Sequence, residues 1–237
     1  KHGDFRELIS PFLQAKMDQA SSLFGVDSAE YRALARQYVR DPAESRIEPL
    51  DRRRHYEAEV SGEHGGAQLK GVERLYRRTV LLEPTTACAA HCRWCLRGQY
   101  DSFTLREEDV DRALEYFALD PDIQELLITG GDPLMAPRML AYILDGIAER
   151  VPNIEIVRIG TRVPLQAPER VSGALLETLQ KPRRLRLEVG VHVCHPSEFW
   201  PEVRDALRVL MDAGIRVYNQ HPLLKGVNDD RDTLFAL

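Results

Sequence analysis

Five short apolar runs alternate with amphipathic stretches along most of the sequence, and this alternation constrains the fold more than any other feature. The apolar runs predict strands at residues 79–83, 125–129, 154–159, 185–191 and 215–219. The stretches between them carry apolar residues at helical spacing, as at Leu140, Ile143, Leu144 and Ile147. Strands that alternate with helices form a mostly parallel sheet with right-handed crossovers. The pattern therefore predicts an α/β protein, with either an open doubly wound sheet or most of a barrel.

The first 70 residues differ from the rest, and we expect a mainly helical N-terminal extension (1–70) followed by a core domain (71–237). Apolar residues recur at helical spacing in 5–13 and 31–38. The glycine-rich stretch 61–71 is the best candidate for a linker. In the core, Thr104 and Glu107 form a capping-box pattern that predicts the start of a helix. The sequence begins without Met and ends inside a new helical pattern, so we expect a fragment of a longer chain.

Composition excludes several classes of protein. The net charge of -5 and the pI near 5.9 argue against a general nucleic-acid-binding protein. No apolar stretch approaches the length of a membrane span, and no signal peptide opens the sequence. Three of the four cysteines lie within residues 88–95, where near neighbours rarely reach disulfide geometry. We therefore expect a protein of the reducing cytoplasm that binds neither nucleic acid nor a membrane.

Polar groups follow each predicted strand at its carboxyl end, where the sites of parallel α/β proteins form. They are Cys88, Cys92 and Cys95, then Gly130, Gly131 and Asp132, then residues 160–162, residues 192–195 and Gln220. Because five strands deliver such groups to the same edge, we expect one shared pocket.

The spacing of Cys88, Cys92 and Cys95 (C-x3-C-x2-C) is the most specific motif and favours an iron–sulfur cluster. Structural zinc needs a fourth ligand, and although His91 lies in the loop, no second C-x2-C or H-x3-H pair follows. A [4Fe–4S] cluster is ordinarily held by four thiolates, so three leave one iron open. S-adenosylmethionine can chelate such an iron through its amino and carboxylate groups. Zinc, or buried thiols without a metal, is the alternative.

The other candidate residues each have a structural alternative. Two glycines after a strand are often just a turn, although they also let the backbone approach a ligand closely. Asp132 can accept a hydrogen bond from an ammonium group, and His192 is more often a satisfied core histidine. Arg97 follows the last cysteine by two residues, and its guanidinium suits bidentate binding of a substrate carboxylate.

These segments resemble the lysine 2,3-aminomutase family of radical SAM enzymes. CAAHCRWC is similar to the family's cluster-binding loop. The segments that follow in the family's order and spacing are LLITGGDPLM, IEIVRIGTRVPLQAPERV, VHVCHPSE and DAGIRVYNQHPLLKGVND. The similarity covers about residues 71–229. It implies a partial (β/α)6 barrel whose sixth strand lies beyond Leu237.

The resemblance also implies roles for individual residues. It makes Cys88, Cys92 and Cys95 the cluster ligands, Gly130, Gly131, Asp132, His192 and Gln220 contacts of S-adenosylmethionine, and Arg97 the partner of the substrate carboxylate. The implied reaction begins with reductive cleavage of S-adenosylmethionine to a 5′-deoxyadenosyl radical. The radical abstracts hydrogen from an amino acid held by pyridoxal phosphate, and nitrogen migrates from the α- to the β-carbon. The expected partners are an amino-acid substrate and an electron donor such as flavodoxin or ferredoxin, while a homo-oligomeric state stays open.

Departures from the family leave pyridoxal phosphate and the substrate open. Thr79 stands where a basic residue helps to hold the phosphate, and Arg78 is the candidate substitute. Gly98 replaces a second arginine of the loop, and the family's pyridoxal-linked lysine lies beyond Leu237. One alternative is therefore a radical SAM enzyme that works on an amino-acid-like substrate without pyridoxal phosphate. A zinc-stabilised binding module is the non-enzymatic alternative.

Overall fold

The computed structural model describes residues 6–42, 44, 61–64, 67–74, 76–95, 102–182 and 184–237. Its strands are β1 (Ser61–His64), β2 (Ala67–Glu73), β3 (Thr79–Leu82), β4 (Glu125–Ile128), β5 (Ile156–Thr161), β6 (Arg186–Val191) and β7 (Arg216–Asn219). Its α-helices are α1 (Pro11–Phe24), α2 (Ala29–Tyr38), α4 (Glu107–Leu119), α5 (Pro137–Arg150), α6 (Val163–Gln166), α7 (Gly173–Gln180), α8 (Pro201–Asp212) and α9 (Arg231–Ala236). Short 3-10 turns are η3 (Pro133–Met135), η4 (Pro168–Arg170) and η5 (Pro196–Glu198).

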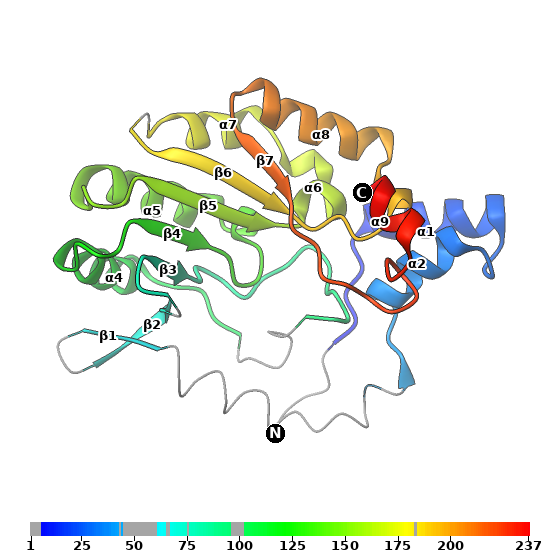
Figure 1. The fold of residues 1–237 in the computed structure, drawn as a ribbon, viewed down its shortest axis with the longest axis horizontal. Coiled ribbons are helices and arrows are strands. Elements are labelled where there is room, and N and C mark those ends of the chain that lie inside the picture. Colours follow the sequence, from blue (N-terminus) through cyan, green and yellow to red (C-terminus); the bar gives the residue numbers. More distant parts are fainter. Residues whose placement is uncertain are drawn as a thin grey trace.

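The strands form one sheet in chain order from β1 to β7, and β3 to β7 are parallel (Figure 1). Doubly wound sheets reverse their strand order at a switch point, whereas a barrel keeps neighbouring strands in sequence. The sequential order therefore decides between the two expected architectures. The predicted α/β fold, with a partial (β/α) barrel, is confirmed.

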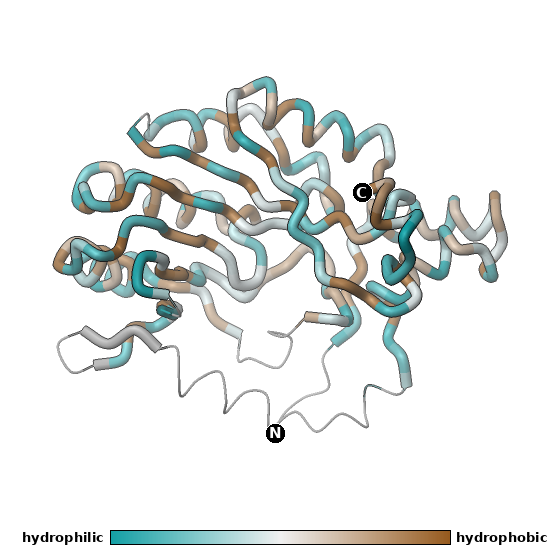
Figure 2. The backbone as a smooth tube through the Cα atoms, in the orientation of Figure 1, coloured by the Kyte–Doolittle hydropathy of each residue, from teal (hydrophilic) through white to brown (hydrophobic). Residues whose placement is uncertain are grey.

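The core lies between the sheet and the helices that connect its parallel strands. Every second residue of β3 to β5 points into this core, as at Leu82, Ile128 and Ile159, all fully buried. The apolar stripes of α4, α5, α7 and α8 pack on the same side of the sheet (Figure 1), and the central strands are correspondingly brown in Figure 2. Each such side chain contributes about 1.5–3 kcal/mol on burial. The third predicted strand begins two residues late, because Ile154 closes a turn with Val151.

Two predictions about the N-terminal part are wrong in detail. Residues 8 and 9 are not helical, because Ser10 caps α1 and accepts a hydrogen bond from the Leu13 amide (3.2 Å). The expected linker contains β1 and most of β2, and β2 pairs antiparallel with β3 through Val72 and Leu82. Within the stretch β1 pairs antiparallel with β2, and Val72, directly after it, is buried, so cross-strand pairing outweighs the glycine content. The expected boundary at residue 70 falls within β2, and the division into two domains stays a prediction.

The predicted capping box at Thr104 and Glu107 is also wrong. Thr104 instead forms a β-bridge with Thr85, with the two hydroxyl oxygens 3.1 Å apart. Helix α4 begins at Glu107, with Arg106 at the N-cap, and the Asp109 carboxylate accepts from the Arg106 amide (2.9 Å). The capping residues are thus three positions apart, as predicted, but lie two residues later in the sequence.

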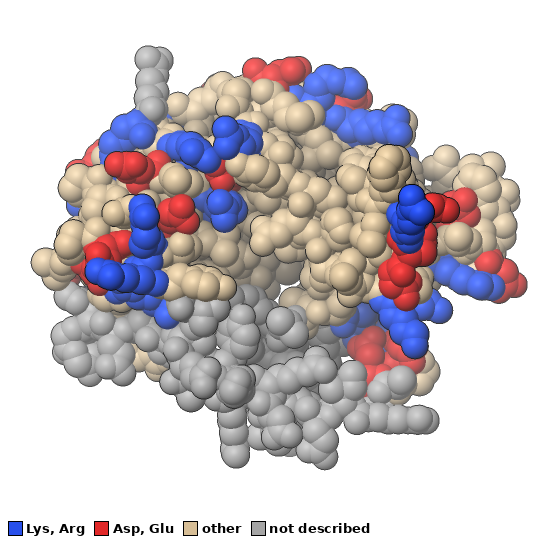
Figure 3. All heavy atoms as spheres, in the orientation of Figure 1, with Lys and Arg blue, Asp and Glu red and all other residues tan. Residues whose placement is uncertain are grey.

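Helices α1 and α2 lie beside the carboxyl ends of the parallel strands (Figure 1). Phe12 packs edge-on against Trp200, and Lys16 pairs with Glu202 at 2.8 Å. On the face drawn in Figure 3, basic and acidic side chains lie beside one another. None of the helices in the described part of the chain has both the length and the apolar character needed to span a membrane.

Candidate active site

The groups that follow the strands meet at one cavity of about 460 Å³. Its lining includes Cys88, Cys92 and Cys95, the turn Gly130, Gly131 and Asp132, and His192. The cavity lies at the carboxyl ends of β3 to β6, as expected for a parallel α/β sheet. The structure therefore brings together all of these predicted site residues. Gln220 is exposed and does not line the cavity. Its backbone amide donates to Val191 O (2.7 Å) at the end of β6.

The turn after β4 holds the chain that leads into the cysteines. The Gly131 amide donates to Thr85 O and the Asp132 amide donates to Ala87 O, each at 2.8 Å. A Cβ at Gly131 would lie 2.4 Å from the carbonyl carbon of Thr86, and Gly130 has a positive φ of 113°. Glycine is therefore needed at residue 130 for the backbone conformation and at residue 131 for close packing.

Asp132 is buried, and both of its carboxylate oxygens accept hydrogen bonds from the protein. The donors are the Thr161 hydroxyl (2.8 and 2.9 Å) and the backbone amides of Leu134 (3.1 Å), Arg162 (2.7 Å) and Val163 (3.1 Å). Burial raises the pKa of this carboxyl, against the effect of its donors. Asp132 thus joins the ends of β4 and β5. Its carboxylate accepts hydrogen bonds from the protein itself, whereas a hydrogen bond from an ammonium group was expected.

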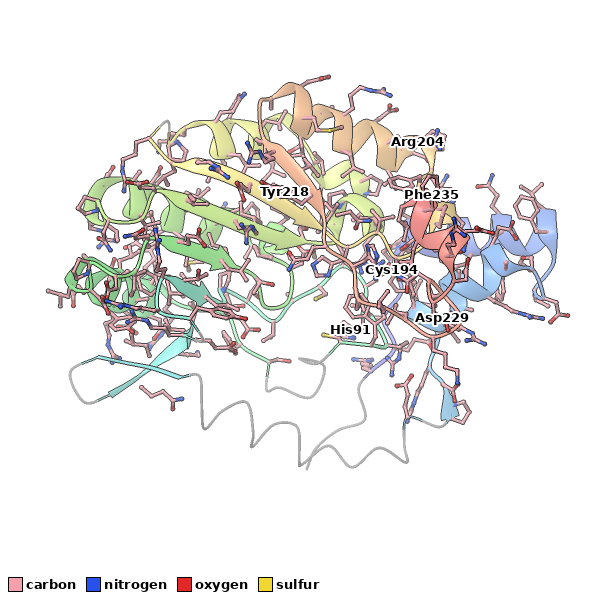
Figure 4. The ribbon with its side chains drawn as sticks, in the orientation of Figure 1. His91, Cys194, Arg204, Tyr218, Asp229 and Phe235 are labelled. Atoms are coloured by element: carbon pink, nitrogen blue, oxygen red, sulfur yellow. The ribbon has the colours of Figure 1, made fainter. Side chains whose placement is uncertain are left out.

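The cysteine loop is also held by the N-terminal part of the chain. The His91 amide donates to Leu8 O and the Arg93 amide donates to Gln37 O, each at 2.8 Å. The Arg93 guanidinium forms a salt bridge with Glu44. Figure 4 places His91 and Cys194 between the sheet and the N-terminal helices. The segment before α1 and helix α2 thus form part of the wall that positions the cysteines.

Arg162 contacts the middle cysteine from the end of β5. Its Nη1 donates to Cys92 Sγ at 3.0 Å, and Gln166 Nε2 makes a longer contact with the same sulfur at 3.5 Å. The second terminal nitrogen of Arg162 donates to Glu198 Oε1 (2.6 Å) and Gln37 Oε1 (3.0 Å). Residue 162 was expected at the end of a strand, but its contact with Cys92 was not predicted. Its partners come from distant segments and share no local pattern.

The environment disfavours a free thiolate at Cys88 and a charged imidazole at His192. Burial raises the pKa of the Cys88 thiol far above its usual range, and the carboxylate of Asp132 adds to the effect. A thiolate at this position therefore needs a bound cation or metal centre to compensate its charge. His192 stacks on Trp94 with ring centroids 6.1 Å apart, and burial together with Arg162 lowers its pKa to about 4. His192 is thus neutral at pH 7.

The donor set fits a cluster better than a single ion. Among the described residues, no three His, Cys, Asp or Glu side chains are gathered closely enough to hold one metal ion. Zinc requires four ligands around one point, whereas a cubane cluster takes one thiolate on each of several irons. Trp94 Nε1 is buried, lies on a cavity-lining residue and has no hydrogen-bond partner in the described part of the protein. The cavity therefore has room and an unsatisfied donor for a bound group.

Two predicted residues are not placed at the cavity by the described part of the structure. Arg97 falls outside the described residues, as does Gly98. Arg78 is exposed at the amino end of β3, opposite the end from which the cysteine loop leaves, and its side chain donates to Gln124. This position gives no support to a phosphate-binding role for Arg78 at the cavity.

Comparison with known proteins identifies relatives of this site. The model of the Radical SAM superfamily matches residues 82–237. L-lysine 2,3-aminomutase of Acetoanaerobium sticklandii is 35% identical over 198 residues, which are 80% of this chain and 47% of that protein. The Clostridium subterminale L-lysine 2,3-aminomutase is 37% identical over 164 residues, 67% of this chain and 38% of that protein. A putative L-lysine 2,3-aminomutase of Aquifex aeolicus is 36% identical over 174 residues, 71% of this chain and 46% of that protein. The chain spans about half the length, or less, of the curated relatives it matches.

Proposed function

Because the chain belongs to the radical SAM superfamily, we propose that Cys88, Cys92 and Cys95 hold a [4Fe–4S] cluster and that the cavity binds S-adenosylmethionine. The superfamily implies both cofactors, and the matched region contains all three cysteines. The observation that carries the proposal is that these cysteines, the glycine turn and His192 line one cavity. Its volume of about 460 Å³ lies within the usual range of small-molecule sites.

The residues divide the work of holding these groups. The three thiolates would bind three irons and leave the fourth open to S-adenosylmethionine. The proposed contacts of S-adenosylmethionine are Gly130, Gly131, His192 and Gln220, and the first three line the cavity. A bound, reduced cluster would supply one electron for cleavage of S-adenosylmethionine into methionine and a 5′-deoxyadenosyl radical.

The protein's own side chains shield this chemistry. Trp94 and His192 stack as one wall of the cavity, and a neutral imidazole adds no charge to that wall. The segment before α1 and helix α2 contact the cysteine loop through the carbonyl oxygens of Leu8 and Gln37. Excluding water prevents side reactions of reactive species.

We further propose that the whole protein acts on an amino acid as a 2,3-aminomutase with pyridoxal phosphate. The support is the similarity to proteins named L-lysine 2,3-aminomutase. Arg97 is proposed as the anchor of the substrate carboxylate, on the sequence alone. A cytoplasmic location and reduction by a flavodoxin or ferredoxin belong to the same proposal. The alternative, a radical SAM enzyme without pyridoxal phosphate, is favoured by Thr79 and Gly98, which stand where the family has basic residues.

Anaerobic reconstitution tests the proposed cluster. We expect about four irons per chain, and 5′-deoxyadenosine should form when the protein is reduced in the presence of S-adenosylmethionine. Cys88→Ala should lose both properties. Cys194→Ala is the matched control and should keep them, because Cys194 packs against Ala33 and Val227. One zinc per chain without cofactor cleavage would contradict the proposal and favour a zinc-stabilised binding module.

Borohydride treatment of the whole protein separates the two enzymatic alternatives. Reduction fixes pyridoxal phosphate covalently to its lysine, which changes the absorbance spectrum and adds a measurable mass. A fixed adduct is expected of an aminomutase. Cofactor cleavage without any adduct would favour the enzyme that does not use pyridoxal phosphate.

A further inference from the structure

Arg162 places a buried positive charge against one of the proposed cluster ligands. Its side chain is 7% exposed, and Nη1 lies 3.0 Å from Cys92 Sγ. Burying a guanidinium costs several kcal/mol unless it is paired and hydrogen-bonded. The Glu198 carboxylate compensates it at 2.6 Å, and Arg162 Nε is left buried without a partner among the described residues. A single carboxylate therefore compensates the Arg162 guanidinium, which also donates a hydrogen bond to Cys92 Sγ.

The orientation of this guanidinium is fixed from several directions. Glu198 is itself fully buried, and its second oxygen accepts from the amides of Cys194 (2.7 Å) and His195 (3.0 Å). The rings of Tyr38 and Trp94 lie 5.1 Å and 5.4 Å from the Arg162 guanidinium carbon. A swing away from Cys92 would break these contacts, so Nη1 stays directed at the sulfur.

We propose that Arg162 is a positioning residue that raises the reduction potential of the cluster by donating to Cys92 Sγ, and that Glu198 offsets part of this effect. The inference rests on the proposed function, since it needs Cys92 to ligate the cluster. Reduction adds an electron to the cluster, and N–H donors to its sulfurs and nearby positive charge both stabilise the reduced form. The Glu198 carboxylate pairs with the other terminal nitrogen of the same guanidinium and offsets part of its positive charge.

A structural role alone makes a different prediction. Arg162 also joins α2 to the end of β5 through Gln37 Oε1 at 3.0 Å. If that link were its whole purpose, removal of either member of the Arg162–Glu198 pair would lower stability without moving the potential in opposite directions. The sign of two potential shifts therefore distinguishes tuning from support.

The experiment is a redox titration of the reconstituted full chain, followed by electron paramagnetic resonance without S-adenosylmethionine. In Arg162→Gln we expect wild-type iron content and a more negative midpoint potential. The ratio of reduced to oxidised cluster at the wild-type midpoint should fall about tenfold, which corresponds to about 59 mV for one electron. Glu198→Gln should shift the potential the other way, and Arg162→Lys, which keeps the charge, should restore part of the loss. Arg158→Gln is the control without a shift, because Arg158 lies on β5, which leads directly to Arg162, but pairs with Glu188 and does not line the cavity.

Each result decides the proposal. Cluster-loaded Arg162→Gln and Glu198→Gln with the wild-type potential, or with shifts of the same sign, would overturn the tuning role and leave the proposed function intact. If Arg162→Gln fails to fold, Glu198→Gln decides alone, since a rise in potential supports the proposal and no change or a fall refutes it. Wild-type protein that binds no iron would overturn the proposed function and this inference with it.

Discussion

At the scale of single residues, Gly131 shows how one missing side chain shapes the site. A Cβ there would lie 2.4 Å from Thr86 C and 2.5 Å from Ala87 O, both backbone atoms just before Cys88. Backbone cannot move aside as the end of a flexible side chain can. The amide of Gly131 also donates to Thr85 O at 2.8 Å, so the close approach is fixed by a hydrogen bond.

We expect Gly131→Ala to lower the free energy of unfolding by about 1–3 kcal/mol, the usual cost of overpacking. It should also reduce the iron content, because the cysteine loop is pushed away. Urea unfolding followed by circular dichroism measures the first effect and iron analysis the second. Gly173→Ala is the control, since nothing lies within 4 Å of its added Cβ at the start of α7. The control should be neutral or more stable by up to about 1 kcal/mol, and an equally stable Gly131→Ala would contradict the contact.

At the scale of secondary-structure elements, Arg184 closes the end of α5 from a distant loop. The last carbonyls of a helix lack partners within the helix, and a cation near them is also favoured by the helix dipole. Arg184 donates to Ala148 O (2.8 Å), Val151 O (2.8 Å), Ile154 O (2.7 Å) and Ile147 O. One side chain thus holds α5 and the turn that leads into β5.

Arg184→Met should destabilise the protein by about 1.5–3 kcal/mol, the range for hydrogen bonds to a charged group. Methionine keeps much of the length of the side chain but donates nothing to these carbonyls. The matched control is Arg208→Met on α8, where the arginine is exposed and pairs with Asp205 at 3.0 Å. A change within about 0.5 kcal/mol is expected there. Denaturant unfolding compares the two, and equal losses would rule out a special role for Arg184.

At the scale of the whole molecule, buried titratable groups link stability to pH. Glu188 of β6 is fully buried. Burial alone would raise the pKa of Glu188, but hydrogen bonds from Arg186, Arg158 and Tyr218 hold it below its usual value. These bonds tie β5, β6 and β7 together on the side of the sheet away from the helices. His192 has a pKa lowered to about 4 by burial and by Arg162. Each of these two shifts makes the unfolded chain bind its proton at higher pH than the folded protein does.

The contribution of His192 to the free energy of unfolding should therefore fall as the pH drops from about 6.5, the usual pKa of histidine, to about 4. In that window the unfolded chain carries the proton and the folded protein does not, which costs up to about 1.4 kcal/mol per pH unit. Above pH 7 both states are neutral and the contribution vanishes. In His192→Asn, the free energy of unfolding of the cluster-free chain should depend less steeply on pH between 6 and 4.5. Equal slopes for the two proteins would contradict the lowered pKa.

Local patterns were sufficient for the core of the protein. The strands at 79–83, 125–129, 185–191 and 215–219 agree with β3, β4, β6 and β7 to within a residue, since each is a short run between stretches of helical periodicity. The three cysteines and the glycine turn were also recognisable, because each lies within one short segment after a strand. The alternation of strands and helices along the sequence could not distinguish an open sheet from a barrel, since both folds show it. The order of the strands within the sheet was needed for that.

The amino-acid sequence by itself determined the α/β class, the parallel strands and the cysteine loop, because these depend on contacts and periodicities within a few residues. Only the tertiary structure decided what surrounds the loop. The bond from Arg162 to Gln37 spans 125 residues, and the bond from Ser10 to Gln166 spans 156. Likewise, the glycine-rich stretch pairs β1 with β2, and directly after it Val72 and Glu73 of β2 pair with β3. Such partners are chosen by packing in space, and no spacing along the chain records them.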